Sequence, residues 1–327
     1  MENLHHILKQ YWGFDDFRPL QEDIITSVTE GRDSIALLPT GGGKSLCYQV
    51  PGLAMEGICV VISPLIALMK DQVEGLQEKG IAAKALSSGM KRDEIDRILD
   101  KAVHQKIRFL YVSPERTLTE LFRERFKRMK VNLIAVDEAH CISQWGYDFR
   151  PSYLHIAEIR ELQPSTPVLA LTATATPKVV EDIREKLGGP NAAVFRKSFE
   201  RKNLAYVVRQ SEDKGGSLLR ILQNVKGTSI VYARSRKRTE SIASFLKKHR
   251  ISAAAYHAGL DQEKRTKLQQ DWLEDRTRVM VATNAFGMGI DKPEVRTVVH
   301  LDLPDSPEAY FQEAGRAGRD GKKSYAV

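Results

Sequence analysis

The sequence contains little cysteine and no long apolar run. Its three cysteines, Cys47, Cys59 and Cys141, are far apart and form no CxxC pair, which excludes a disulfide framework and a four-cysteine zinc site, so buried and reduced thiols are expected. No apolar stretch approaches the roughly 18 residues of a membrane helix, and the start, MENLHHILKQ, does not resemble a secretory signal. We expect a cytoplasmic protein that binds neither a membrane nor zinc.

Residues 201–327 are poor in acidic side chains. They carry 24 Lys+Arg against 15 Asp+Glu, whereas residues 1–200 carry 26 against 27, and the whole chain has a net charge of +8. A polyanion bound to the second part would gain affinity by releasing counterions, but a solvated basic face explains the same numbers. Charge alone therefore does not identify a partner.

The length and composition favour two folded domains. A chain of 327 residues with 42% hydrophobic and 28% charged residues has enough apolar material for two cores and shows no sign of disorder. Short β-branched runs alternate with segments of helical periodicity, which predicts parallel sheets flanked by helices. The predicted strands are 34–38, 58–63, 107–113, 132–138, 167–173, 228–233, 252–256, 278–283 and 296–301.

A change of composition marks the domain boundary. The segment 188–203, GGPNAAVFRKSFERKN, is rich in Gly, Pro, Asn and charge, and this composition predicts a linker. We expect one domain over residues 1–195 and a second over residues 196–327. The chain stops at KKSYAV inside what resembles a strand, so the second domain is expected to be a truncated one.

A glycine-rich turn leads from the first predicted strand into a helix. In LLPTGGGKSL, backbone NH groups and a helix N-terminus can surround phosphate oxygens, while Lys44 reaches the outer phosphates and Ser45 a magnesium ion. Leu38 stands where the generic GxxxxGK[ST] pattern has its first glycine, so a chance glycine-rich turn stays open. The expected nucleotide-binding residues here are Thr40, Gly41, Gly42, Gly43, Lys44 and Ser45.

Two adjacent carboxylates follow a predicted buried strand in LIAVDEAH. Asp137 can hold magnesium and Glu138 can orient or deprotonate the attacking water. Such pairs are often only solvated or capping groups, but their position after GGGKS in an α/β chain favours catalysis. Near the other end, QEAGRAGRDG offers Arg316 and Arg319 for transition-state charge, and two surface arginines are the alternative.

The order and wording of the motifs resemble the RecQ family of superfamily 2 DNA helicases over essentially the whole chain. The motifs that carry the resemblance are FDDFRPLQ (14–21), PTGGGKSLCYQ (39–49), SPLIALMKDQ (63–72), YVSPER (111–116), DEAHCISQWGYDFRP (137–151), LTATAT (171–176), YHAGL (256–260), ATNAFGMGIDKP (282–293) and QEAGRAGRDG. The resemblance implies two RecA-like domains that use ATP and Mg²⁺.

The resemblance also implies roles for residues outside the glycine loop. Gln21 would recognise the adenine edge with help from Arg18, and Phe14 would pack against the base. The arginine finger would be Arg319, with Arg316 close to the nucleotide. Gly287 and Asp291 match a segment that responds to both ATP and DNA.

Aromatic residues follow the carboxylates directly in HCISQWGYDFRP. Trp145, Tyr147 and Phe149 beside Gln144 and Arg150 can stack single-stranded bases, each worth about 1–3 kcal/mol, without reading sequence. Alternatively, Trp145 and Phe149 fill the core of the first domain.

Two histidines accompany these motifs. His140 either relays the signal from DNA or only forms a hydrogen bond within its loop. His257 resembles a motif that faces DNA, but a single histidine after an apolar strand is more often a satisfied structural residue.

These observations predict an ATP-dependent DNA helicase that moves on single-stranded DNA, with 3′ to 5′ direction implied by resemblance only. Its expected partners are single-stranded DNA and DNA duplex or fork junctions, and its expected form is a monomer. An RNA helicase or a duplex-DNA translocase is the nearest alternative. A nucleic-acid-binding module that holds ATP without turnover is an alternative of another class.

Overall fold

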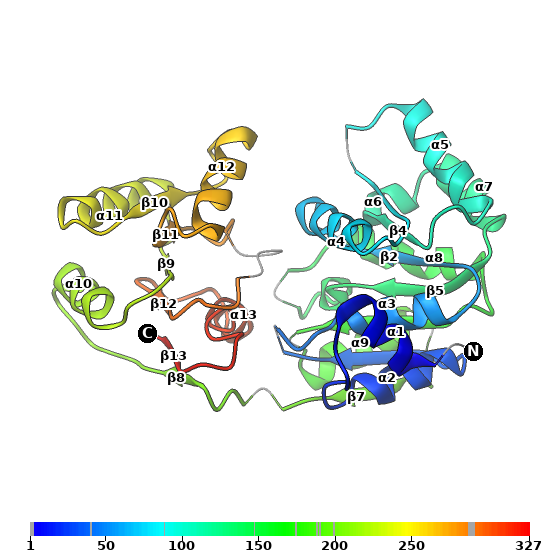
Figure 1. Ribbon diagram of the computed structural model, residues 1–327, viewed down its shortest axis with the longest axis horizontal. Helices are drawn as coiled ribbons and strands as arrows, with labels where there is room; N and C mark the ends of the chain where they lie inside the picture. The colour runs from blue at the N-terminus through cyan, green and yellow to red at the C-terminus, as the bar shows by residue number, and fades with distance from the viewer. Residues whose placement is uncertain are drawn as a thin grey trace. The chain divides into compact units, whose positions relative to one another are not determined.

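The computed structural model describes residues 3–39, 41–87, 89–146, 148–173, 175–187, 189, 191–198, 200–286 and 292–327. It consists of two compact units, residues 1–199 and residues 200–327, and Figure 1 shows their elements. The boundary taken from the sequence lies after residue 195. All three cysteines lie in the described ranges and are free and buried, as predicted.

In unit 1, the described residues form a parallel sheet of seven strands in the order β3-β4-β2-β5-β6-β1-β7. The strands are β1 (Ser34–Leu37), β2 (Ile58–Ile62), β3 (Ala83–Leu86), β4 (Phe109–Val112), β5 (Val131–Val136), β6 (Val168–Thr172) and β7 (Ala193–Arg196). The five strands between the two edges are buried on both faces, because helices cover both sides of the sheet.

The helices of unit 1 are distributed over the two faces. On one face, α2, α3 and α4 bury one set of alternating strand side chains, and α1 packs on α2 and α3. The other face is covered by α5, α7, η1, η2, α8 and α9. The bounds are α1 (Leu4–Trp12), α2 (Gln21–Thr29), α3 (Leu46–Ala54), α4 (Ile66–Glu78), α5 (Arg92–Val103), α6 (Pro114–Thr117), α7 (Glu120–Lys127), η1 (Ala139–Ile142), η2 (Pro151–His155), α8 (Ile156–Glu161) and α9 (Pro177–Lys186).

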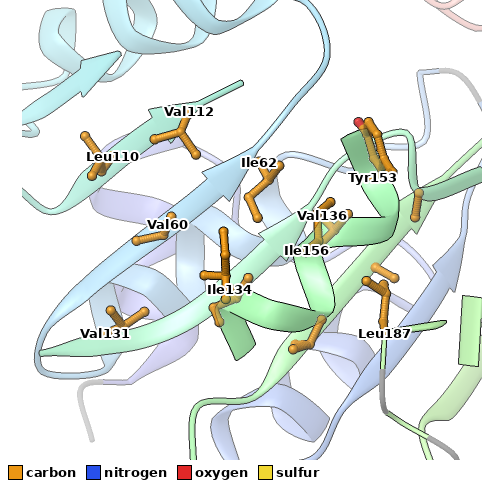
Figure 2. Close-up of a cluster of buried hydrophobic side chains, with 14 of the residues drawn as sticks. Val60, Ile62, Leu110, Val112, Val131, Ile134, Val136, Tyr153, Ile156 and Leu187 are labelled. Atoms are coloured by element: carbon orange, nitrogen blue, oxygen red, sulfur yellow. The ribbon is translucent and has the colours of Figure 1, made fainter. Parts of the chain in front are cut away.

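Strand alternation decides which side chains enter each core. In β2, Val60 and Ile62 belong to the core under η2 and α8, whereas Cys59 and Val61 point to the opposite face. Figure 2 shows Val60 and Ile62 beside the side chains of β4 and β5, with Tyr153 of η2 in the same cluster. This packing fixes the end of β5, where the two predicted catalytic carboxylates follow.

Unit 2 contains a second parallel sheet, whose described strands have the order β10-β11-β9-β12-β13-β8. Helices α10 and α11 cover one face, and α12 and α13 contribute to the core on the other. The bounds are β8 (Leu204–Tyr206), α10 (Lys214–Asn224), β9 (Ser229–Tyr232), α11 (Arg236–Lys248), β10 (Ala253–Tyr256), α12 (Gln262–Leu273), β11 (Val279–Ala282), β12 (Thr297–His300), α13 (Pro307–Ala314) and β13 (Ser324–Ala326).

The predicted α/β class with parallel sheets is confirmed, and one detail of the prediction is wrong. The segment expected to be a linker contains β7, which pairs with β1 from Ser34↔Ala193 to Leu37↔Arg196. This strand lies at the sheet edge and is only partly buried, so it lacks the continuous apolar run of a central strand. Among the described residues, none of the helices combines the length and the apolar composition of a membrane span.

Candidate nucleotide and nucleic-acid site

The glycine loop between β1 and α3 has a backbone that only glycine adopts easily. Gly41 and Gly43 have φ angles of 78° and 77°, in the left-handed region that disfavours other residues. A Cβ on Gly42 would lie 2.8 Å from the Pro39 carbonyl oxygen. Ser45 caps α3, which begins at Leu46. Thr40, also predicted to bind nucleotide, lies outside the described residues.

The side chains of Arg18, three residues before α2, and of Gln21, the first residue of α2, brace this loop. The Arg18 Nη1 donates to the Gly41 carbonyl at 2.7 Å, and the Gln21 Nε2 donates to the Gly43 carbonyl at 2.9 Å. The Gln21 Oε1 accepts a hydrogen bond from the Arg18 backbone NH at 2.8 Å, and the Gln21 side chain is buried. Phe14 is 50% exposed nearby in sequence. Two of the residues predicted to contact the adenine base, Arg18 and Gln21, therefore hold the glycine loop in this structure.

The paired carboxylates directly follow β5, which ends at Val136. The Asp137 NH extends the sheet by donating to the Ile62 carbonyl at 2.9 Å, and the Asp137 Oδ1 accepts from the Glu138 NH at 3.0 Å. Glu138 has a φ of 48°, a left-handed conformation that is costly for a residue with a Cβ. The turn thus holds both carboxylates close together at the strand end.

Burial makes this pair of carboxylates electrostatically unfavourable without a cation. Burial, and next the neighbouring Glu138 carboxylate, raise the pKa of Asp137, while the Lys44 ammonium opposes the shift. Within the described part of the chain, the buried Glu138 Oε2 accepts no hydrogen bond, although the His140 Nδ1 lies 3.4 Å away. The structure thus brings Lys44, Asp137 and Glu138 into one electrostatic site.

His140 is buried between the carboxylates and the end of β6. Its Nδ1 lies 3.0 Å from the Thr172 hydroxyl, and burial lowers the pKa of His140 to about 4, so the ring is neutral at pH 7. The Tyr153 hydroxyl donates to the Asp137 carbonyl at 2.8 Å. Sequence reasoning did not assign Tyr153 or Thr172 to the site, and only LTATAT, which contains Thr172, gave a signal.

The loop after the carboxylates presents a tryptophan to solvent. Trp145 is 64% exposed, so it does not fill the core of unit 1. The Lys178 Nζ of α9 lies 3.2 Å from the centre of the Trp145 ring, a cation–π contact that sequence reasoning missed. The Trp145 NH donates to the Ser143 hydroxyl, which donates to Asp182 at 2.5 Å. Ser143 and Asp182 thereby fix the loop against α9.

The other predicted DNA contacts of this loop differ in exposure. Gln144 is exposed, and Phe149 is partly buried. The Arg150 guanidinium donates twice to Asp148 at 3.0 and 3.2 Å, so it is paired within its own loop. Tyr147 lies outside the described residues.

Unit 2 carries the two predicted catalytic arginines in the turn after α13. Arg316 is 5% exposed and Arg319 is partly exposed. The Arg316 guanidinium is close to the Tyr232 hydroxyl and partly offsets the burial that raises the pKa of Tyr232 to about 12. Arg316 is therefore held inside unit 2, while Arg319 reaches its surface.

The remaining predicted site residues are His257, Gly287 and Asp291. His257 is 4% exposed, and its Nε2 lies 3.1 Å from the Glu240 carboxylate. This geometry is typical of the structural histidine that was the alternative. Gly287 and Asp291 lie outside the described residues.

Comparison with known proteins assigns the family. The DEAD/DEAH box helicase model matches residues 18–183, and the helicase conserved C-terminal domain matches residues 213–321. The chain is 44% identical over 322 residues to the ATP-dependent DNA helicase RecQ of Haemophilus influenzae, covering 98% of this chain and 52% of the relative. The chain belongs to the DEAD/DEAH box helicase family, and it is similar to relatives that are named RecQ.

A second curated relative has the same name. The chain is also 44% identical to the ATP-dependent DNA helicase RecQ of Bacillus subtilis, over 98% of this chain and 55% of the relative. It spans about half the length of these two curated relatives. The structure of a leucine-to-valine variant of Dbp5 from S. cerevisiae, bound to RNA and ADP BeF3, matches 100% of this chain and 88% of that chain with a TM-score of 0.77 and 22% identity. The predicted tandem RecA-like fold is thereby confirmed.

Proposed function

We propose that this chain is the motor core of an ATP-dependent DNA helicase, which couples ATP hydrolysis to movement on single-stranded DNA and to duplex separation. The observation that carries the proposal is the buried Asp137–Glu138 pair beside Lys44, at the sheet end that continues into the exposed Trp145. The same short segment thus joins a phosphate and metal site to a base-stacking side chain. The names of the relatives support DNA as the substrate, and the 3′ to 5′ direction rests on resemblance.

The glycine loop and the carboxylates fit Mg²⁺–ATP. Backbone NH groups of residues 40–43 and the Lys44 ammonium would hold the phosphates, and Ser45 and Asp137 would hold Mg²⁺. Asp137 is buried and has a raised pKa, and the neighbouring Glu138 Oε2 accepts no hydrogen bond from the described residues. These carboxylate oxygens would be ligands for a divalent cation, whose charge would remove the free-energy cost of burying two carboxylates side by side. When bound, Mg²⁺ would neutralise phosphate charge.

Hydrolysis would use residues of both units. Glu138 would orient and deprotonate the attacking water, because its Oε2 has no competing hydrogen bond among the described residues. Arg319 would supply positive charge to the transferring phosphate, with Arg316 beside the nucleotide. Gln21, Arg18 and Phe14 would contact the base, and Gly287 and Asp291 would respond to nucleotide and DNA.

Single-stranded DNA would contact the loop after the carboxylates. An exposed Trp145 ring provides a stacking face, and Lys178 beside it would meet the negative backbone. Gln144, Phe149 and Arg150 would flank the strand, and the neutral His140 would link strand occupancy to Glu138. For His257 we retain only a minor DNA contact, since the side chain is buried beside Glu240.

ATPase rates with and without single-stranded DNA test the proposal. Lys44→Ala should abolish turnover, because the phosphates lose their cation. Trp145→Ala should keep basal hydrolysis near the wild-type rate and lose most of the DNA stimulation. Leu303→Ala, a control at another exposed apolar residue, should behave as wild type. Equal DNA stimulation of the wild type and Trp145→Ala would refute the coupling role of Trp145.

The alternatives predict different results in the same assay. Stronger stimulation by single-stranded RNA than by DNA would identify an RNA helicase. Stimulation by blunt duplex DNA without unwinding of tailed duplexes would indicate a translocase. A wild-type protein that binds ATP but never turns it over would be a gated binding module. Duplexes with 3′ and 5′ tails, compared side by side, determine the direction of movement.

A further inference from the structure

Arg201, at the start of unit 2, binds the backbone of the turn that carries Arg316 and Arg319. Its Nη2 donates to the carbonyls of Ala317 at 3.0 Å and Gly318 at 2.7 Å, and its Nη1 lies 3.5 Å from the Gly315 carbonyl. Arg201 belongs to the segment 188–203, whose composition predicts a linker and assigns no role to its residues.

Two of the three carbonyls belong to the peptide groups that precede the predicted catalytic arginines. The Gly315 carbonyl is in the peptide that joins Gly315 to Arg316, and the Gly318 carbonyl is in the peptide that joins Gly318 to Arg319. A planar guanidinium that binds several carbonyls at once fixes the orientation of those peptide planes. The direction in which each arginine side chain leaves the backbone is therefore set partly by Arg201.

A second side chain from the same segment binds the same place. The Asn203 Nδ2 donates to the Gly318 carbonyl at 2.8 Å and to the Lys322 carbonyl at 3.0 Å. Gly318 has a φ of 63°, and an added Cβ would lie 2.6 Å from that Asn203 nitrogen and 2.7 Å from the Ser324 hydroxyl. The turn is thus clamped from the side of β8 with no free space.

Arginines that bind the carbonyls at helix ends also occur elsewhere in the chain. Arg278 donates to a carbonyl in the last turn of α10, that of Leu222, and to two carbonyls just after it, those of Val225 at 2.9 Å and Gly227 at 3.1 Å. Such contacts stabilise a helix end, whose last carbonyls lack helical donors. Arg278 and Arg201 therefore have the same structural contribution, but only Arg201 binds a turn with predicted catalytic side chains.

We propose that Arg201 is a positioning residue for ATP hydrolysis, which holds the Gly315–Gly318 backbone so that Arg316 and Arg319 are aimed correctly. The proposal rests on the proposed function, because it requires that these arginines act on the nucleotide. Misplacing a charged group by about 1 Å costs up to roughly a hundredfold in rate. Because the proposed phosphate-binding residues, Lys44 among them, belong to unit 1, the loss should appear in kcat more than in KM for ATP.

The test measures DNA-stimulated ATPase kinetics of the full chain. Arg201→Met should lower kcat by about tenfold to a hundredfold with KM for ATP changed by less than about threefold. Arg201→Lys should recover part of the rate, because an ammonium binds fewer carbonyls than the planar fork. Arg278→Met is the matched control, and it should lose similar thermal stability while keeping kcat.

A double variant separates positioning from general damage. If Arg201 acts through Arg319, adding Arg201→Met to Arg319→Ala should lower kcat no further than Arg319→Ala alone, within about twofold. Multiplicative losses, or a wild-type kcat in folded Arg201→Met, would overturn the inference. If Arg201→Met does not fold, Asn203→Ala tests the same contact with the Gly318 carbonyl. We expect a smaller fall in kcat for Asn203→Ala, and an unchanged kcat would contradict the positioning role. A wild-type rate in both Arg316→Ala and Arg319→Ala would instead refute the role of the arginines in the proposed function.

Discussion

Replacing Asp137 by Asn should stabilise unit 1 at neutral pH while it abolishes ATP hydrolysis. The carboxylate is buried beside Glu138, and its pKa is raised from 3.8 to about 6, first by burial and then by Glu138. Asn has nearly the same shape, and its Oδ1 can still accept the Glu138 NH hydrogen bond of 3.0 Å. The substitution therefore removes a buried charge and creates no cavity.

The sign and size of this change in stability follow from proton linkage. A folded-state pKa above the unfolded value means that the folded protein binds the proton more tightly, so the stability present below pH 3.8 is lost as pH rises through about 6. Each unit of pKa is worth about 1.4 kcal/mol, which gives roughly 3 kcal/mol above pH 6. Asn at this position avoids that loss, and Asp137→Asn should be more stable by up to about that amount at pH 7.5.

Urea unfolding between pH 4 and 8, without nucleotide or Mg²⁺, measures this difference. The gap in unfolding free energy between Asp137→Asn and the wild type should be near zero at pH 4 and grow with pH. Asp16→Asn at an exposed site should stay within about 0.5 kcal/mol of the wild type at every pH. A constant gap, or a less stable variant at pH 7.5, would refute the electrostatic reasoning.

Three further predictions concern the glycine loop, DNA affinity and a buried lysine. Gly43→Ala should destabilise unit 1 by about 1–2 kcal/mol, because the φ of Gly43 is 77° and an added Cβ would lie 2.3 Å from the Gln21 Nε2. The same variant should bind an ATP analogue more weakly in titration calorimetry. Unchanged affinity would contradict the proposed role of the loop. The logarithm of single-stranded DNA affinity should fall with log salt with a slope steeper than about −2 in fluorescence anisotropy, and a flat response would argue against phosphate contacts. Lys292→Met should destabilise unit 2 by about 2–3 kcal/mol in urea unfolding, because the buried Lys292 Nζ binds the Leu273 carbonyl at 2.7 Å and the exposed Asp275 carboxylate at 2.9 Å. Wild-type stability of this variant would show that these bonds contribute nothing net.

Central strands were predictable from the sequence, whereas three of the four edge strands were not, β10 being the exception. All nine predicted strands exist, because a strand covered on both faces needs a continuous apolar run, such as ICVVI in β2. The predicted strands do not include β3, β7 and β8, which all lie at sheet edges. An edge strand is partly solvated, so AVFR of β7 carries no distinctive pattern.

The amino-acid sequence by itself determined the fold class, the helicase family and the order of the site motifs, because each depends on local residue type and spacing. The tertiary structure decided which groups meet. Gln21 braces Gly43 from a separate helix, and Lys178 covers Trp145 across the loop. Arg201 reaches a turn more than a hundred positions away in the chain. Such contacts depend on packing between segments that are distant in the chain, and residue spacing gives no signal for them. A glycine loop or a carboxylate pair, in contrast, consists of a few neighbouring residues and can be recognised from the sequence.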